Sequence, residues 1–124
     1  MSKLIDTLMA GPELDWLVCQ ACGIKAWPPE NGGIHPVRIQ DSNLRMLRAF
    51  CPSTNWTDAM LAAERTELFE WGAVALFKSR NTNRWSVADV FETHHVIAAE
   101  ADSGPLAICR AILKAKASHA ESAT

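Results

Sequence analysis

Hydrophobic residues recur at helical spacing in the first part of the chain. Residues 2–10 place their apolar side chains on one side of a helix, and residues 12–23 repeat this spacing. Pro12 suits the first turn of the second helix, and Gly23 supplies its stop. The pattern therefore predicts two short helices, separated at Gly11.

The pattern is weaker between residues 24 and 54. Residues 28–33 combine prolines and glycines and are typical of a turn or an exposed loop. Residues 36–40 alternate between apolar and polar positions as a short strand does, and Pro36 favours a strand start or a sheet edge. Residues 44–50 fit either a helical turn or a second strand, and both interpretations remain open.

A third helix is expected after Asn55, a residue that suits the N-cap position. The apolar side of this helix is predicted to consist of Trp56, Met60, Leu61, Leu68 and Trp71. The helix is expected to end near Gly72. The apolar run over residues 72–77 then predicts a buried strand.

Two further strands follow in a hairpin connection. Residues 81–83 predict a turn, and residues 84–91 and 93–101 predict strands on the pattern of their side chains. Strands joined by such short loops are antiparallel neighbours.

The last helix has the clearest start in the chain. Asp102 or Ser103 can cap it, and Pro105 lies in its first turn. Residues 118–124 are expected to fray. One face of the helix is predicted to carry Leu106, Cys109 and Leu113, with Ile108 and Ile112 beside them.

These elements predict an α+β fold. We expect a three-layer α-β-α sandwich, with helices packed on a mainly antiparallel sheet of about three to five strands. A chain of 124 residues with 48% hydrophobic residues forms one domain and can bury a single core. The five tryptophans are expected to pack in that core.

Charge and cysteine content indicate the setting of the protein. The formal net charge of −2 gives no general attraction to nucleic acid or to an anionic membrane, so nucleic acid is not favoured as a partner. No apolar run approaches the length of a membrane span, and the N-terminus lacks the apolar core of a secretory signal. A reduced, cytoplasmic environment is the simpler interpretation of the four cysteines.

Three segments carry a resemblance to a known family. They are Gly-Pro-Glu-Leu-Asp-Trp-Leu-Val at residues 11–18, Ser-Thr-Asn at residues 53–55, and Asp-Ser-Gly-Pro-Leu-Ala-Ile-Cys-Arg-Ala at residues 102–111. With these segments the chain resembles the phage ABA sandwich domain family, which consists of small proteins encoded by phages and prophages. The resemblance implies an α-β-α sandwich and a phage origin, and it brings no catalytic residues. The chain departs from the family at Cys19 and Cys22.

On this basis we expect a non-enzymatic phage accessory protein in the host cytoplasm that binds a host or phage protein. Inhibition of a host factor, such as a CRISPR effector of bacterial defence, is one such role, and homo-oligomers are left open. The predicted contact surfaces are residues 31–50 and the basic hairpin around residues 81–83, namely Lys78, Arg80, Asn81, Asn83, Arg84 and Trp85. The same hairpin residues also suit a soluble turn with charges that block sheet extension.

Two constellations suggest other chemistry. Cys19 and Cys22 form a CxxC motif before Gly23, and His35 and Cys51 could complete a zinc site in a small zinc-dependent binding module. The same pair also suits thiol redox chemistry, or packing as small hydrophobic residues.

The other constellation lies on the last predicted strand and the residues that flank it. Glu92, His94, Glu100 and Asp102 share strand parity, and a histidine among carboxylates suits a metal-assisted hydrolase. A solvated strand end has the same composition.

Overall fold

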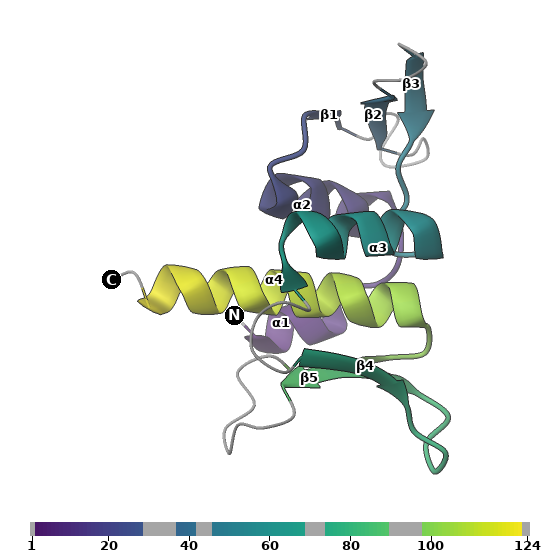
Figure 1. Ribbon diagram of the computed structural model, residues 1–124, viewed down its shortest axis with the longest axis vertical. Coiled ribbons are helices and arrows are strands. Elements are labelled where there is room, and N and C mark those ends of the chain that lie inside the picture. The colour runs from purple at the N-terminus through teal and green to yellow at the C-terminus, as the bar shows by residue number, and fades with distance from the viewer. Residues whose placement is uncertain (1, 29–36, 42–45, 69–73, 90–97, 123–124) are drawn as a thin grey trace.

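The computed structural model describes residues 2–28, 37–41, 46–68, 74–89 and 98–122. Over these residues the chain forms helices α1 to α4 and two three-stranded antiparallel sheets, so the α+β class is confirmed (Figure 1). The strands are divided between two sheets, where the sequence pattern indicated one. Helices α2, α3 and α4 lie between these sheets in Figure 1.

The first two helices are α1 (Ser2–Thr7) and α2 (Pro12–Cys22). Helix α1 is shorter than predicted, while α2 begins and ends at the predicted residues. Gly23 adopts a left-handed φ of 69°, and its N–H closes the last turn of α2. A side chain would be strained in this conformation, which explains the glycine stop.

The first sheet consists of β1 (Ala26–Trp27), β2 (Arg38–Asp41) and β3 (Met46–Ala49), in that order. Residues 44–50 fitted either a helical turn or a strand, and β3 shows that they contain a strand. Val37, Ile39 and Phe50 are buried, so the ends of β2 and β3 join the core. Most of the predicted 28–33 loop lies outside the described residues.

Helix α3 (Trp56–Arg65) begins where Asn55 was predicted to cap it, and the Asn55 side chain accepts a hydrogen bond from the N–H of Asp58 at 2.9 Å. The helix ends at Arg65, well before the predicted end near Gly72, which lies outside the described residues.

The predicted apolar side of α3 was wrong for its two largest described side chains. Trp56 and Met60 are 44% and 45% exposed, whereas Ala59, Ala62 and Ala63 are buried. Helix α3 packs on α4 and α2 through this alanine face. Small side chains let the helices approach closely, and the larger ones turn outward.

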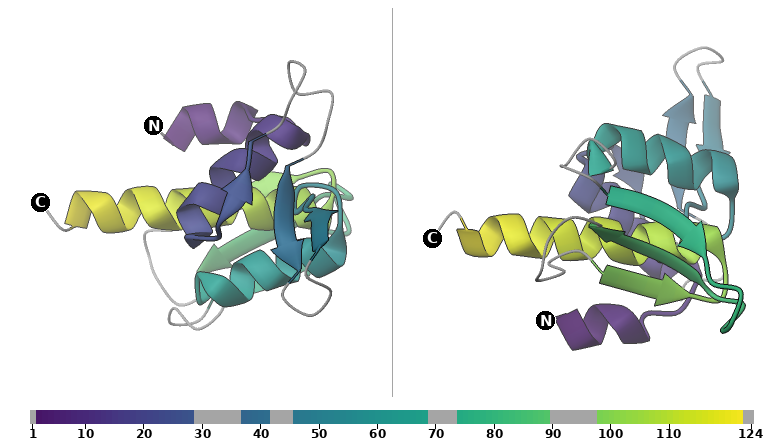
Figure 2. Two further views of the ribbon diagram at one scale, coloured as in Figure 1. Left: turned by 90° about the horizontal axis from the view of Figure 1, so that it is seen from above. Right: turned by 60° about the horizontal axis from the view of Figure 1, so that its bottom comes forward.

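The second sheet contains β4 (Val74–Lys78), β5 (Trp85–Asp89) and β6 (Ala98–Ala101). The predicted turn joins β4 and β5, with the N–H of Ser79 donating to the carbonyl of Arg84 at 2.9 Å. Asn83 adopts a positive φ of 56°, a conformation that asparagine tolerates better than most residues. Figure 2 shows this sheet along one side of α4, with α1 next to it.

Helix α4 (Gly104–Ser122) forms the centre of the molecule and contacts α1, α2, α3, β5 and β6. The hydroxyl of Ser103 accepts a hydrogen bond from the N–H of Leu106 at 3.3 Å, so Ser103 is the cap. Ile108 and Ile112 are fully buried in its core-facing side. The backbone of residues 118–122 continues the helix, and the expected fraying of residues 118–124 stays a prediction.

Candidate partner-binding surface

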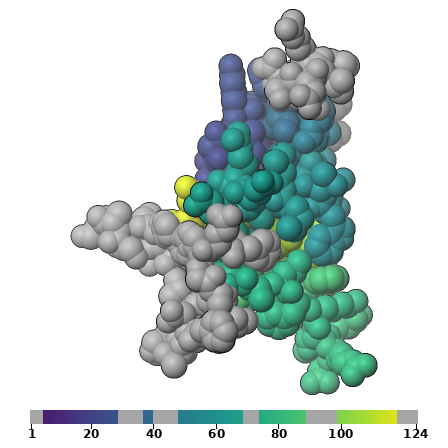
Figure 3. All heavy atoms as spheres, viewed as in Figure 1, coloured from purple at the N-terminus to yellow at the C-terminus, as the bar shows by residue number. Residues whose placement is uncertain are grey.

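Trp56, the first residue of α3, and Trp85, the first residue of β5, form an aromatic pair. Figure 3 shows α3 (teal) and the β4–β5 hairpin (green) on the same side of the molecule. The centroids of the two tryptophan rings lie 5.1 Å apart with the planes at 70°, which is the favourable edge-to-face arrangement. Lys78 Nζ lies 5.7 Å from the centroid of the Trp85 ring. Met60 lies one turn along α3 from Trp56. We call Trp56, Met60, Lys78 and Trp85 the aromatic patch.

The ring of Trp56 packs directly against Gly104. This glycine is the first residue of α4, and a Cβ atom at its position would overlap the six-membered ring of Trp56. The ring is therefore confined by Gly104 on one side and by Trp85 on another. An exposed side chain that is already ordered loses little conformational entropy when a partner covers it.

A buried polar network fixes the loop that precedes α3. The N–H of Ser53 donates to Asp15 Oδ1 at 2.8 Å, and the N–H of Gly11 donates to Ser53 Oγ at 2.9 Å. Asp58 Oδ2 accepts from the N–H of Cys51 at 2.9 Å. Because these bonds join the starts of α2 and α3, they also fix the position of Trp56.

The carboxyl group of Asp15 is the most constrained group in this network. Its residue is 2% exposed, and burial raises its pKa above 3.8, against the lowering effect of the hydrogen bonds from Ser53. Its partner Ser53 is distant in sequence, so the pattern contained no signal for the contact.

The predicted hairpin site is divided between two faces of the second sheet. Lys78 and Trp85 join the aromatic patch, while Arg80, Asn81 and Asn83 are exposed near the hairpin tip. Arg84 points to the opposite face, where its Nε lies 3.0 Å from Glu100 Oε1 and its Nη1 lies 2.7 Å from Asp102 Oδ1.

Tryptophan burial differs from the expectation. Trp56 is exposed, and Trp16, Trp27 and Trp85 are partly buried. Trp71 lies outside the described residues. Sequence reasoning missed Trp56 and Met60 as surface residues because their spacing matches that of a buried stripe.

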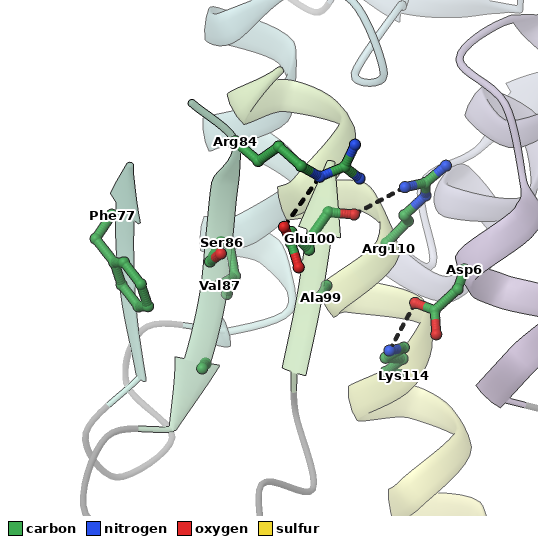
Figure 4. A pocket seen from close by; sticks show the side chains of 10 residues that line it. Asp6, Phe77, Arg84, Ser86, Val87, Ala99, Glu100, Arg110 and Lys114 are labelled. Atoms are coloured by element: carbon green, nitrogen blue, oxygen red, sulfur yellow. Dashed lines mark hydrogen bonds and ion pairs between the residues drawn. The ribbon is translucent and has the colours of Figure 1, made fainter. Parts of the chain in front are cut away.

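A groove lies at the edge of the second sheet formed by β6, where side chains of the sheet, α1 and α4 meet. Strand alternation places Val87 and Ala99 toward α4, and Phe77 and Glu100 on the opposite face. The cavity has a volume of about 440 Å³. Figure 4 shows it with side chains from the sheet, α1 and α4. We call it the outer groove, and the residues that define it are Asp6, Phe77, Arg84, Glu100, Arg110 and Lys114.

Arg110 fixes one end of this groove. Its Nε and Nη2 donate to the carbonyl of Leu8 at 3.2 and 2.7 Å, and its Nη1 donates to the carbonyl of Glu100 at 2.8 Å. These bonds tie the segment after α1, the strand β6 and the helix α4 together. The acceptors are main-chain carbonyls, so the residue pattern contains no signal for this role.

The cysteines are free and poorly ionised. Cys19 and Cys109 are buried, and Cys22 and Cys51 are partly buried. Burial raises the pKa of Cys19 to about 12 and that of Cys22 to about 11. The Cys22 thiol donates to the carbonyl of Ala62 at 3.6 Å.

The zinc interpretation stays a prediction. Within the described part of the chain, no three histidine, cysteine or acidic side chains gather in a way that could hold a metal ion. His35, which the predicted site requires, lies outside that part.

The hydrolase interpretation also stays a prediction. Glu100 and Asp102 do share a face and meet at Arg84, as strand parity predicted. Glu92 and His94 lie outside the described residues.

No family model, curated protein or solved structure matches this chain. Of the helices described, none is long and apolar enough to cross a membrane.

Proposed function

We propose that this chain is a non-enzymatic binding protein that docks on a partner protein through the aromatic patch. The observation that carries the proposal is the Trp56 ring, which is exposed at the surface and held in place by Gly104 and Trp85. Tryptophan is enriched among the residues that dominate binding energy at protein interfaces. Met60 beside it offers a flexible, polarisable side chain that adapts to a partner surface.

The charges around the patch favour an acidic partner surface. Lys78 belongs to the patch and Arg80 lies at the nearby hairpin tip, both exposed. Arg84 is already paired with Glu100 and Asp102 on the other face of the sheet. The positive charge available to a partner is therefore local, although the chain has a net charge of −2. Complementary charge raises the rate and specificity of association more than the affinity itself.

The resemblance to phage proteins supports the choice of a host protein as partner. In this proposal the protein acts in the host cell and inhibits or redirects that partner by covering part of its surface. Components of bacterial defence, such as CRISPR effectors, are the first candidates to test.

The proposal is tested by affinity capture from bacterial lysate, with Trp56→Ala and Met60→Ala compared with the unchanged protein. Truncation of a central interface tryptophan costs about 2 kcal/mol or more, so Trp56→Ala should weaken binding by at least about tenfold. Met9→Ala is the matched control for Met60→Ala, because Met9 is 78% exposed, lies between α1 and α2 and does not belong to the patch.

Two results would contradict the proposal. One is the absence of any partner recovered at near-stoichiometric yield. The other is a partner whose affinity for Trp56→Ala equals its affinity for Met9→Ala, with both variants folded as judged by urea unfolding.

A further inference from the structure

Strand β4 is an edge strand of the second sheet. The strand order is β4, β5, β6, and of the described elements β5 alone runs alongside β4. Figure 4 shows the strands side by side, with Phe77 on the strand farthest from Arg110. The outer side of an edge strand presents main-chain N–H and C=O groups, and such a row is a template for a strand of another chain.

The hairpin turn determines which residues of β4 turn these groups outward. The N–H of Ser79 donates to the carbonyl of Arg84 at 2.9 Å, so these two residues form a hydrogen-bonded pair. Hydrogen-bonded and non-hydrogen-bonded pairs alternate along an antiparallel ladder. The next pair in the register is Lys78 with Trp85, and it is therefore a non-hydrogen-bonded pair. Lys78 thus directs its N–H and C=O away from β5.

Three residues of β4 share this outward direction. Steps of two from Lys78 lead to Leu76 and Val74, the first residue of the strand. The intervening Phe77 and Ala75 direct their N–H and C=O groups toward β5. The outer edge of β4 therefore presents a donor and an acceptor at each of three alternate positions. We call this row the β4 edge, defined by Val74, Leu76 and Lys78.

The opposite edge of the sheet confirms the alternation. Trp85 turns its main-chain groups away from β4 and so toward Ala101, its partner in β6. The neighbouring Glu100 must then turn its carbonyl to the outer edge of β6. Arg110 Nη1 donates to this carbonyl at 2.8 Å, as the alternation requires. The edge of β6 is thus engaged by a side chain of the protein itself, which makes the β4 edge the better place for a partner.

The side chains of β4 indicate what kind of strand fits there. Lys78 is exposed and lies on the face of the sheet that carries Trp85, and the exposed Arg80 lies nearby at the hairpin tip. An acidic residue opposite Lys78 would form a favourable cross-strand pair, and a basic one would be repelled. Phe77 is 45% exposed on the other face, so an apolar residue opposite it would cover the ring.

We propose that the β4 edge receives an extended segment of the partner protein, with an acidic residue opposite Lys78 and an apolar residue opposite Phe77. The inference rests on the proposed function, since Lys78 belongs to both the β4 edge and the aromatic patch. In this mode of recognition, main-chain hydrogen bonds supply affinity and the alternating side chains supply specificity. One extended segment can therefore contact the edge and the patch together.

The experiment uses the full chain labelled with ¹⁵N and the capped peptide acetyl-Glu-Ile-Val-Ile-Glu-amide as the probe. The peptide reads the same in both directions, so a glutamate can lie opposite Lys78 whichever way it runs. At about ten times its Kd, the peptide should slow amide hydrogen exchange of Leu76 and Lys78 by about tenfold. The amides of Ala75 and Phe77 are directed to β5 and are the internal controls. No slowing, or equal slowing at all four amides, would overturn the proposal.

Two further peptides test the backbone and the charge. Methylation of the central valine nitrogen removes the donor that faces β4 and blocks its approach, so this peptide should bind at least about tenfold more weakly. Replacement of both glutamates by lysine should weaken binding by about threefold, because like charges then meet at Lys78. An N-methylated peptide that binds as tightly as the unmodified one would refute strand addition.

Two variants of one residue test the edge from the side of the protein. Lys78→Ala removes the charge, whereas Lys78→Pro also removes the outward N–H. Proline is tolerated on an edge strand where its nitrogen faces away from the sheet. Lys78→Pro should therefore bind the probe at least about tenfold more weakly than Lys78→Ala. Equal binding by the two folded variants would contradict the proposal. If Lys78→Pro does not fold, the N-methylated peptide decides the question.

The outcomes separate this inference from the proposed function. Capture of a partner that depends on Trp56, without protection of the Leu76 and Lys78 amides in the complex, would refute strand addition and leave the aromatic patch standing. Protection by the probe, without any captured partner, would support the β4 edge and count against the proposed function. Protection that rises with protein concentration alone would assign the edge to a second copy of the chain and overturn the proposal.

Discussion

At the scale of single residues, Gly104 determines where the exposed ring of Trp56 lies on the surface. Gly104 has no Cβ, and the ring of Trp56 occupies the space where that atom would lie. Trp56 is exposed because α3 turns its alanine face to the core, and it is ordered because Gly104 and Trp85 confine it. The geometry of the candidate site therefore depends on one residue that no partner would touch.

Gly104→Ala should destabilise the protein through this contact. The added methyl group must displace the Trp56 ring, and overpacking of this kind costs about 1–3 kcal/mol in the free energy of unfolding. In the Trp56→Ala background the same change should be neutral or slightly stabilising, because alanine restricts the unfolded chain more than glycine does. Urea unfolding of the four proteins in this double-mutant cycle measures the coupling. An identical cost of Gly104→Ala in both backgrounds would show that Trp56 is not the obstacle.

At the scale of elements, the sequence predicted helix starts better than helix faces. Pro12, Asn55 and Ser103 act on groups a few residues away, so local pattern alone locates the starts of α2, α3 and α4. The inner face of α3 depends on close packing with α4, which is encoded by alanines spread over both helices. Large apolar side chains at helical spacing then suggest a buried stripe that does not exist.

The candidate site was only partly predictable for the same reason. The hairpin that contributes Lys78 and Trp85 follows from a local turn and strand pattern. Trp56 reaches Trp85 across 29 positions of the chain (85 minus 56), and Arg110 reaches the Leu8 carbonyl across 102. Contacts over such separations arise from tertiary packing and leave no periodic signal in the sequence.

Asp15, where α2 meets the loop before α3, makes the free energy of unfolding depend on pH. Burial raises the pKa of Asp15 above 3.8, so the folded protein binds this proton more tightly than the unfolded chain does. Its contribution to stability is therefore complete below about pH 3.8 and is lost as the pH rises through the folded-state pKa. Asp15→Asn keeps an acceptor for the N–H of Ser53 and removes the titration.

Relative to the unchanged protein, Asp15→Asn should therefore gain stability as the pH rises from about 4 to about 7, as measured by urea unfolding. Glu13→Gln is the control, since it removes a charge in the same turn of α2 without contact to Ser53. A stability difference that is the same at every pH would contradict this account.

At the scale of the whole molecule, α4 is the element that holds the parts together. It contacts the other three helices and two strands of the second sheet. Arg110 adds bonds to the main chain after α1 and in β6, two segments that do not form one continuous sheet or helix. The small helix α1, with Ile5 buried beneath it, depends on these contacts because six residues do not form a stable helix alone.

Arg110→Met should loosen α1 more than it destabilises the rest of the fold. It leaves the carbonyls of Leu8 and Glu100 without their donor, at a cost of about 2 kcal/mol. Hydrogen exchange should show lost protection in α1 while α3 keeps its own. Arg84→Met is the matched control: it breaks two ion pairs at the same groove that are largely exposed to solvent and worth less than about 1 kcal/mol. Equal protection of α1 in both variants would show that Arg110 does not hold α1 in place.

Because the pKa values of the thiols are raised, the rate of cysteine alkylation can report the local opening of this molecule. With a pKa of about 11, only about one Cys22 side chain in ten thousand is a thiolate at neutral pH. An alkylating reagent therefore reacts slowly until a segment opens and the thiol ionises as it does in water. The thiols lie in α2, in the loop before α3 and in α4. The order in which they gain reagent mass, read by mass spectrometry, reports the order in which these segments separate.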